Sequence, residues 1–153
     1  MRVRLERMPQ ERIGPWLAAA DAEYVEARIL SGESREVAEA NAAASTAEHF
    51  PGGVLLETHR LFEIVAEDDV VGFLWIGPTA IAPSDWWVWD IEIHEPYRRK
   101  GYARTALELG HAEAKRLGAT TIGLNVFGYN TGAQELYASL GYTVTSTRMK
   151  REL

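Results

Sequence analysis

The densest run of chemically capable side chains in the sequence lies at residues 98–104, where RRKGYAR places four cations around one glycine. A glycine loop that opens a helix presents free backbone N–H groups together with the positive end of the helix dipole. Phosphates bind at such points, and arginine and lysine side chains add positive charge around them. The run therefore indicates a site for a small anionic ligand. The alternative is a solvated turn that carries surface charges.

A second group of reactive side chains lies in WWVWDIEIHE, residues 86–95. If helices cover both faces of the sheet, polar side chains in one row of a strand indicate a wet cleft in which protons can be transferred. A polar strand face open to solvent is the alternative. Strict alternation along a strand predicts one face with Val88, Asp90, Glu92 and His94, and the opposite face with Trp87, Trp89, Ile91 and Ile93.

The elements that must position these residues follow from periodicity and from the turn residues between them. Apolar residues at helical spacing predict helices over about 13–30, 34–49, 105–117 and 133–140, the last two ended by Gly118 and Gly141. Alternating or β-branched runs predict strands over 2–7, 61–77 with a hairpin turn at 67–69, 86–95, 120–127 and 142–153.

Composition bounds the class of protein. The chain has 153 residues, is 46% hydrophobic and has no Gly/Ser-rich or Pro-rich break, which predicts one domain over residues 1–153. The absence of cysteine excludes a disulfide framework, a thiolate nucleophile and a cysteine-built zinc site, and we expect no metal. A net charge of -6 disfavours nucleic acid as a partner. We expect no membrane span and no signal peptide, and therefore a cytoplasmic location.

Two motifs carry a resemblance to a known family. The strand Ile91-Glu92-Ile93, Pro96 and the run 98–103 resemble the acetyl-CoA signature of the GNAT family of N-acetyltransferases, a strand followed by Q/R-x-x-G-x-G/A. Downstream, VFGYNTGAQELYASLGY resembles the family's second signature of strand, Asn, short helix with Tyr, and Gly-aromatic. The resemblance covers roughly residues 55–147. It implies a GNAT-like α/β fold, with a twisted mixed sheet of six or seven strands and helices on both faces.

The resemblance also implies where acetyl-CoA binds, namely in the splay between the strands that contain WDIEI and IGLNV. The backbone of Ile91 and Ile93 would bond the pantetheine amides, and Asn130 would contact the pantetheine arm. Alternatively, Asn130 or Thr131 only caps the following helix, with Gln134 completing a capping box. The pyrophosphate would lie in the loop formed by Arg98, Arg99, Lys100, Gly101, Tyr102, Ala103 and Arg104.

For the chemistry, Tyr137 matches the tyrosine that many family members aim at the CoA sulfur, so the resemblance implies that it is the acid. By spacing alone, Tyr137 is a core residue on the apolar face of its helix. We expect Glu92 as the base or as the anchor of a proton-carrying water, with His94 as the second candidate. Relatives that acetylate protein N-termini often have glutamate where this chain has Asn125, so that base is absent.

The predicted activity is direct transfer of an acetyl group from acetyl-CoA to a primary amine of a small molecule or peptide. A homodimer is plausible because the family often forms one. Two alternatives are a CoA-binding sensor or scaffold without catalysis and a nucleic-acid binder that uses the run 98–104. The acceptor could meet an aromatic and acidic wall suited to a cationic amine. Its candidates, which otherwise are core and solvated surface, are Trp16, Glu23, Tyr24, Glu26, Trp86 and Trp87.

Overall fold

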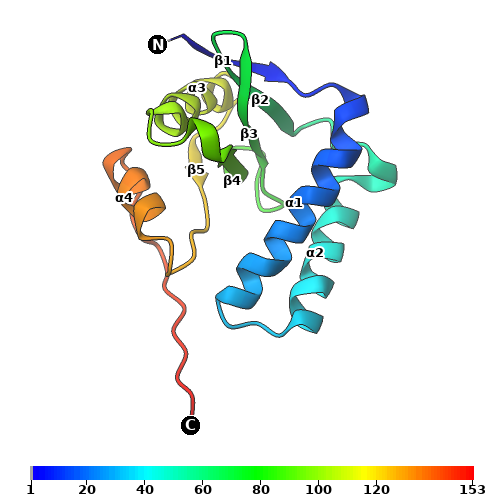
Figure 1. The fold of residues 1–153 in the computed structure, drawn as a ribbon, viewed down its shortest axis with the longest axis vertical. Helices are drawn as coiled ribbons and strands as arrows, with labels where there is room; N and C mark the ends of the chain where they lie inside the picture. The colour runs from blue at the N-terminus through cyan, green and yellow to red at the C-terminus, as the bar shows by residue number, and fades with distance from the viewer. Residues whose placement is uncertain (1) are drawn as a thin grey trace.

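A five-stranded mixed sheet runs through the molecule in the order β1-β2-β3-β4-β5 (Figure 1). The computed structural model describes residues 2–153. The first four strands pair antiparallel, whereas β5 pairs parallel to β4. The predicted hairpin forms between β2 and β3, turning at residues 67–68. The strands are β1 (Val3–Arg7), β2 (Arg60–Ala66), β3 (Asp69–Pro78), β4 (Asp85–Ile93) and β5 (Thr121–Gly123).

Four α-helices accompany the sheet and cover both of its faces, as the sequence predicts (Figure 1). Helices α1 (Gln10–Leu30) and α2 (Arg35–His49) pack together on one face. Helix α3 (Tyr102–Arg116) packs on the other face, against β1, β3 and β4. Helix α4 (Thr131–Ser139) follows β5 at the edge of the sheet, and two short 3-10 turns occur at η1 (Pro51–Gly53) and η2 (Glu95–Tyr97).

Local signals explain where the helices begin. The Ser34 side chain accepts a hydrogen bond of 3.2 Å from the backbone N–H of Val37 and so caps α2 at the predicted position. Helix α3 begins three residues before the predicted start, because Gly101 takes a left-handed conformation (φ 82°) and residues 102–104 form its first turn. Glycine adopts this conformation without steric cost. The basic run therefore spans both the loop and the first turn of α3.

Two separate cores stabilise the two faces of the sheet. The first, which we call the α3-side core, is mainly aliphatic, and its largest fully buried side chains are Ile64, Val71, Leu74, Ile76 and Leu107. The second, the α1-side core, is built around Ile13, Phe50, Leu61 and Trp75, with Trp16 and Trp89 packed against it. Alternation along β2 and β3 divides the residues between the two cores, because successive side chains of a strand point to opposite faces.

A β-bulge in β4 overturns the predicted alternation along this strand. Trp75 lies opposite Asp90 and Ile76 lies opposite Val88, so Trp89 is an extra residue with no direct partner. Val88 on one side of the bulge and Ile91 on the other both pack in the α3-side core, whereas Trp89 packs in the α1-side core. An extra residue shifts the two-residue period by one position, so Trp89 does not share a face with Ile91.

The sheet has five strands within residues 2–153, where the family resemblance implied six or seven. Strand β5 covers three residues rather than the predicted eight, and residues 143–153 form neither helix nor strand. We call residues 143–153 the tail, and in Figure 1 it runs away from the body of the molecule. A strand needs a neighbour to complete its backbone hydrogen bonds, and the tail has no neighbouring strand here. None of the described helices is long and apolar enough to cross a membrane.

Candidate active site

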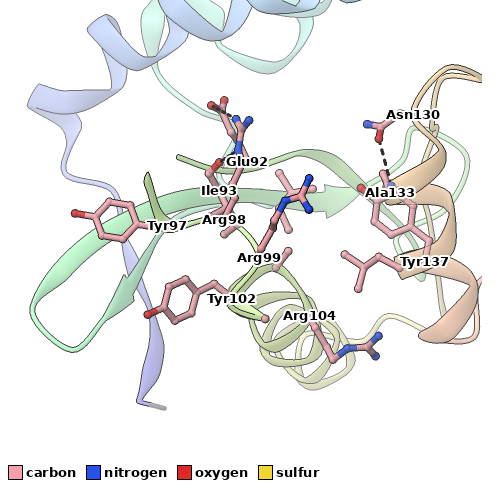
Figure 2. A pocket seen from close by; sticks show the side chains of 15 residues that line it. Glu92, Ile93, Tyr97, Arg98, Arg99, Tyr102, Arg104, Asn130, Ala133 and Tyr137 are labelled. Carbon is pink, nitrogen blue, oxygen red and sulfur yellow. Dashed lines mark hydrogen bonds and ion pairs between the residues drawn. The ribbon is translucent and has the colours of Figure 1, made fainter. Parts of the chain in front are cut away.

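A cleft of about 500 Å³ opens where the second half of β4 meets the start of α3 and the inner side of α4 (Figure 2). Strands β4 and β5 pair only from Asp85 to Trp87, so the cleft lies on the part of β4 that has lost its β5 neighbour. The residues predicted to bind acetyl-CoA line this cleft, except Lys100, and so do Glu92 and Tyr137. The sequence interpretation missed four further lining residues: Tyr97, Gly132, Ala133 and Leu136.

The loop before α3 presents a run of free backbone donors. Among the described residues, no backbone N–H from Arg99 to Arg104 donates a hydrogen bond. Arg99 and Gly101 both have left-handed backbones, with φ of 63° and 82°. Successive N–H groups in alternating right- and left-handed conformations converge on one point and form an anion-binding concavity. The positive end of α3 adds to it, since no side chain caps this helix and its first turn is free of acidic residues.

The arginine side chains around this loop differ in what they contact. The Arg98 Nε donates a 2.7 Å hydrogen bond to the Ile93 carbonyl, and its guanidinium lies 3.8 Å from a Glu92 carboxylate oxygen. Arg104 donates to the Ser139 hydroxyl at 2.5 Å and so connects the first turn of α3 to α4. In Figure 2 the Arg99 side chain projects into the space between β4 and Tyr137. Arg98 therefore contacts β4, whereas the Arg99 side chain points into the cleft.

Asn130 sits at the rim of the cleft and caps α4. Its Oδ1 accepts a 3.2 Å hydrogen bond from the backbone N–H of Ala133. The predicted capping box between Thr131 and Gln134 does not form, because the Gln134 amide donates instead to the carbonyls of Phe127 and Gly128. The same residue thus fixes the start of α4 and borders the cleft, so the two roles considered for Asn130 are compatible.

Of the residues that line the cleft, Glu92 has the pKa that departs furthest from its ordinary value. Burial is the largest cause, and hydrogen bonding and repulsion from Glu23 together with repulsion from Asp90 raise the pKa of Glu92 further, to about 7, against a smaller lowering by Arg98. Burial likewise raises the pKa of Asp90 to about 6. A carboxyl group whose pKa lies near 7 exchanges a proton readily at neutral pH, as a general base must.

Tyr137 projects from α4 and lines the same cleft as Glu92 (Figure 2). Burial, followed by repulsion from the Asp90 charge, raises the pKa of Tyr137 above its ordinary value. The phenol therefore stays protonated throughout the neutral range and is able to donate its proton. Residues from β4 and from α4, more than 40 positions apart in the chain, therefore line one cleft.

The other predicted roles separate in space. His94, the second candidate base, does not line the cleft, and its backbone N–H bonds the Val71 carbonyl at 2.8 Å. Asn125 is exposed on the segment after β5. Among residues 2–153, no three histidine, aspartate or glutamate side chains gather in a way that could hold a metal ion.

The predicted acceptor wall does not form as one surface. Trp86 is buried in the α3-side core, and Trp16 packs edge-on against Phe73 and Trp75 on the other face. Glu26 pairs with Arg35 at 2.9 Å. Glu23 on α1 raises the pKa of Glu92 and so lies near this cleft residue. Helical periodicity placed Glu23 on α1, but its contact with β4 depends on how α1 crosses the sheet, which the sequence pattern does not contain.

Comparison with known proteins adds to this geometry. Residues 22–142 match the model of the acetyltransferase (GNAT) family. YycN of Bacillus subtilis, an uncharacterized N-acetyltransferase, is 30% identical over all of both chains, and the uncharacterized N-acetyltransferase YdgE of the same organism is 27% identical over 97% of both. The crystal structure of YycN superimposes with a TM-score of 0.89, at 29% identity, and covers 99% of each chain.

Proposed function

The chain belongs to the acetyltransferase (GNAT) family, and from that premise we propose that it transfers an acetyl group from acetyl-CoA directly to a primary amine of a small molecule or peptide. An N-acetyltransferase of this family uses an acyl-CoA donor. The choice of acetyl as the acyl group and the roles of the cleft residues are the parts we propose here.

Six consecutive free amides, from Arg99 to Arg104 within the described chain, support the donor site most directly. A pyrophosphate carries several acceptor oxygens and negative charge, and it matches convergent N–H groups at a helix start. The Arg99 and Arg104 side chains add cations at the two ends of this run. The backbone of Ile91 and Ile93 would hold the pantetheine arm, although the Ile93 carbonyl already accepts one bond from Arg98.

Glu92 is the proposed base. A neutral amine loses one proton from its nitrogen as it becomes an amide, and Glu92 takes that proton either directly or through a water. A raised pKa makes Glu92 a better proton acceptor than an ordinary carboxylate while leaving a large ionised fraction at neutral pH. Arg98 keeps a positive charge within 3.8 Å of this carboxylate and so limits the rise.

Tyr137 is the proposed acid. The carbon–sulfur bond of the thioester breaks as the carbon–nitrogen bond of the amide forms, and the sulfur leaves with the electron pair. Tyr137 gives its phenolic proton to that sulfur and regains a proton from solvent, while the proton taken up by Glu92 returns to solvent. One proton therefore enters the enzyme at Glu92 and one leaves at Tyr137, so charge balances over the reaction.

The donor site can be tested at Ala103, which lies in the first turn of α3 and lines the cleft. Glutamate is well tolerated in the first turn of a helix, so Ala103→Glu should fold while placing a carboxylate among the free amides. We expect it to weaken acetyl-CoA binding at least about tenfold in titration calorimetry, because like charges a few ångströms apart repel by more than that factor. Ala103→Gln is the matched control, equal in size and neutral.

Equal affinities for the two Ala103 variants would contradict the pyrophosphate site. Catalysis needs a separate assay, because a CoA-binding sensor would pass the calorimetric test. We expect thiol release from acetyl-CoA to accelerate with at least one member of a panel of primary amines. Donor binding without any acetylated amine, across small amines and peptides, would favour the sensor instead.

A further inference from the structure

Two side chains of α3 bind α4, the helix that carries Tyr137 at the edge of the sheet (Figure 1). Arg104 donates to the Ser139 hydroxyl, and a hydrogen bond of 2.6 Å joins the His111 Nε2 to the Tyr142 hydroxyl. Within the described chain, no other hydrogen bond joins α4 or the turn after it to another helix. Arg104 lines the cleft, whereas His111 lies outside the cleft lining, and the mechanism above gives it no role.

The end of α4 brings Tyr142 against Tyr137. Gly141 has a left-handed backbone (φ 93°), and the Tyr142 N–H donates a 3.0 Å hydrogen bond to the Tyr137 carbonyl. The Gly141 N–H donates to the Ala138 carbonyl at 3.1 Å. These two bonds form a Schellman motif, which brings the side chains at its two ends into contact. The centroids of the two tyrosine rings accordingly lie 5.8 Å apart, with the rings tilted by 59°. The Tyr142 ring therefore packs beside the phenol of Tyr137.

His111 and Tyr142 have the protonation states that a stable hydrogen bond requires at neutral pH. Burial lowers the pKa of His111, so its imidazole is neutral. Burial, and then the nearby Tyr137, raise the pKa of Tyr142 to about 12, so its hydroxyl keeps its proton. A hydroxyl both donates and accepts, so the bond forms with either imidazole tautomer. Both side chains are partly buried, and each would lose a polar partner if the other were removed.

We propose that His111 and Tyr142 are positioning residues for Tyr137. The imidazole fixes the Tyr142 ring, and that ring holds the Tyr137 phenol in the orientation from which it protonates the leaving sulfur. Proton transfer requires the donor within about 3 Å of the acceptor, so orientations that point the phenol elsewhere are unproductive. A fixed neighbouring ring removes such orientations before the substrate binds. This inference rests on the proposed role of Tyr137 as the acid.

A purely structural role for the same bond makes a different prediction. If the bond only held α4 in place, its loss would displace the whole helix, including Ala133 and Leu136, which line the donor site. Acetyl-CoA binding would then weaken together with transfer. The start of α4 is held separately by the Asn130 cap and by Gln134, which donates to the Phe127 carbonyl. A positioning role therefore predicts slower transfer with unchanged affinity for acetyl-CoA.

The first test observes residue 137 without any catalysis. A single 3-fluorotyrosine replaces Tyr137, and its ¹⁹F NMR signal is recorded in the folded protein and in urea. Tyr142→Phe keeps the ring and removes the hydroxyl, whereas His111→Leu removes the imidazole. We expect both changes to broaden the signal and to move it toward that of the unfolded chain, because the ring samples more orientations.

Two matched variants accompany this measurement. His111→Gln supplies an amide that can bond the Tyr142 hydroxyl, and it should restore the wild-type signal. Tyr129→Phe removes a hydroxyl that makes no hydrogen bond within the described chain, from a side chain that is exposed, and it should leave the signal unchanged. Circular dichroism checks that each variant is folded. A signal that neither Tyr142→Phe nor His111→Leu moves would overturn the proposal without any activity assay.

The second test measures single-turnover transfer to an amine that the panel assay identifies. Tyr142→Phe and His111→Leu should each slow transfer about fivefold, the factor that one net hydrogen bond contributes. The Kd for acetyl-CoA, measured by calorimetry, should stay within about twofold of the wild-type value, since the donor site is not displaced. In a Tyr137→Phe background the same two changes should have no further effect, because no phenolic proton remains to be positioned.

The outcomes separate this inference from the proposed function. A fivefold loss that persists in Tyr137→Phe, or an equal loss of acetyl-CoA affinity, would overturn the positioning role in favour of a structural one. If Tyr137→Phe slows transfer and the Tyr142 and His111 variants do not, only the positioning role fails. Full transfer by Tyr137→Phe would refute the acid assignment itself, and the positioning role with it.

Discussion

The cores on the two faces of the sheet contain different kinds of side chain. The α3-side core contains aliphatic side chains such as Ile64, Leu74 and Leu107, each at most 1% exposed. On the α1 side, aromatic rings pack around two buried histidines, with His49 and Trp89 rings 4.3 Å apart and the His59 and Trp89 rings stacked at 5.6 Å. The Trp75 Nε1 donates a 3.0 Å hydrogen bond to the His59 Nδ1.

The two cores therefore differ in how their contribution to stability depends on pH. A hydrocarbon core contributes the same stability at every pH, because it has no group that gains or loses a proton. The α1 side buries His59 and, through the bulge at Trp89, leads directly to Asp90 and Glu92, all with shifted pKa values. We therefore expect pH to act on the α1 side and on the cleft, and to leave the aliphatic α3-side core unaffected.

The largest expected effect is the loss of activity when Glu92 is replaced. Glu92→Gln should lower kcat/KM for an identified amine by about 100- to 1000-fold, because a general base commonly contributes such factors. In the wild type kcat/KM should rise with pH through about 7, since Glu92 works in its deprotonated form. Steady-state rates from pH 5.5 to 9 measure both.

The control is Glu95→Gln, which replaces an exposed carboxylate outside the cleft. If the kcat/KM profile of Glu92→Gln still showed an inflection near pH 7, Glu92 would be excluded as the base.

The next effect tests the α3 side by itself. Leu107→Ala removes a side chain that is 1% exposed and should lower the free energy of unfolding by about 3 kcal/mol, from lost burial and the cavity left behind. Leu109→Ala, two positions along the same helix but 37% exposed, should cost less than about 1 kcal/mol. Urea denaturation at pH 6 and pH 8 should give the same difference between the two variants. A difference that changes with pH would contradict a neutral core.

A smaller effect comes from His59. Burial, and then the nearby His49, lower the pKa of His59 to about 4. Because the unfolded chain takes up this proton near pH 6.5 and the folded one does not, His59 makes the protein progressively less stable as pH falls from about 6.5 to about 4. We expect a loss of roughly 3 kcal/mol from this residue over that range.

Two carboxyl groups change the free energy of unfolding in the opposite direction as pH falls. Asp90 and Glu92 have raised pKa values, so the folded protein takes up their protons first and is stabilised as pH falls. The informative quantity is therefore the difference between wild type and His59→Gln, which keeps an acceptor for Trp75 but does not titrate. Urea unfolding between pH 4.5 and 7.5 should show a flatter loss toward low pH in His59→Gln. Parallel curves would show that His59 is not the titrating group.

The smallest expected effect concerns the ion pair between Arg98 and Glu92. The Arg98–Glu92 pair is 3.8 Å apart with side chains 52% and 25% exposed, so solvent screens it strongly. Arg98→Gln should raise the pKa of Glu92 and move the midpoint of the kcat/KM profile upward by roughly 0.3–0.5 pH unit. Lys100→Gln removes an equal charge from the same loop outside the cleft lining and should leave the midpoint in place. A downward shift in Arg98→Gln would contradict the pairing.

Much of the fold and of the candidate site follows from local pattern. The order of strands and helices, the cap at Ser34 and the free loop around Gly101 depend on a few neighbouring residues, which a single sequence displays. The position of Tyr137 on a short helix is local too, although its place in the cleft came from the family resemblance. In these cases the residues that decide the outcome lie within one or two helical turns of each other.

Tertiary contacts decided the rest. The extra residue at Trp89 depends on how β4 pairs with β3, and that pairing placed Trp89 against Trp75 instead of beside Ile91. The contact of Glu23 with Glu92 depends on how α1 lies over the sheet. The tail shows the same limit most clearly. Its β-branched residues favour a strand, but a strand forms only where another segment offers hydrogen bonds, and the sequence pattern of the tail does not say where that segment is.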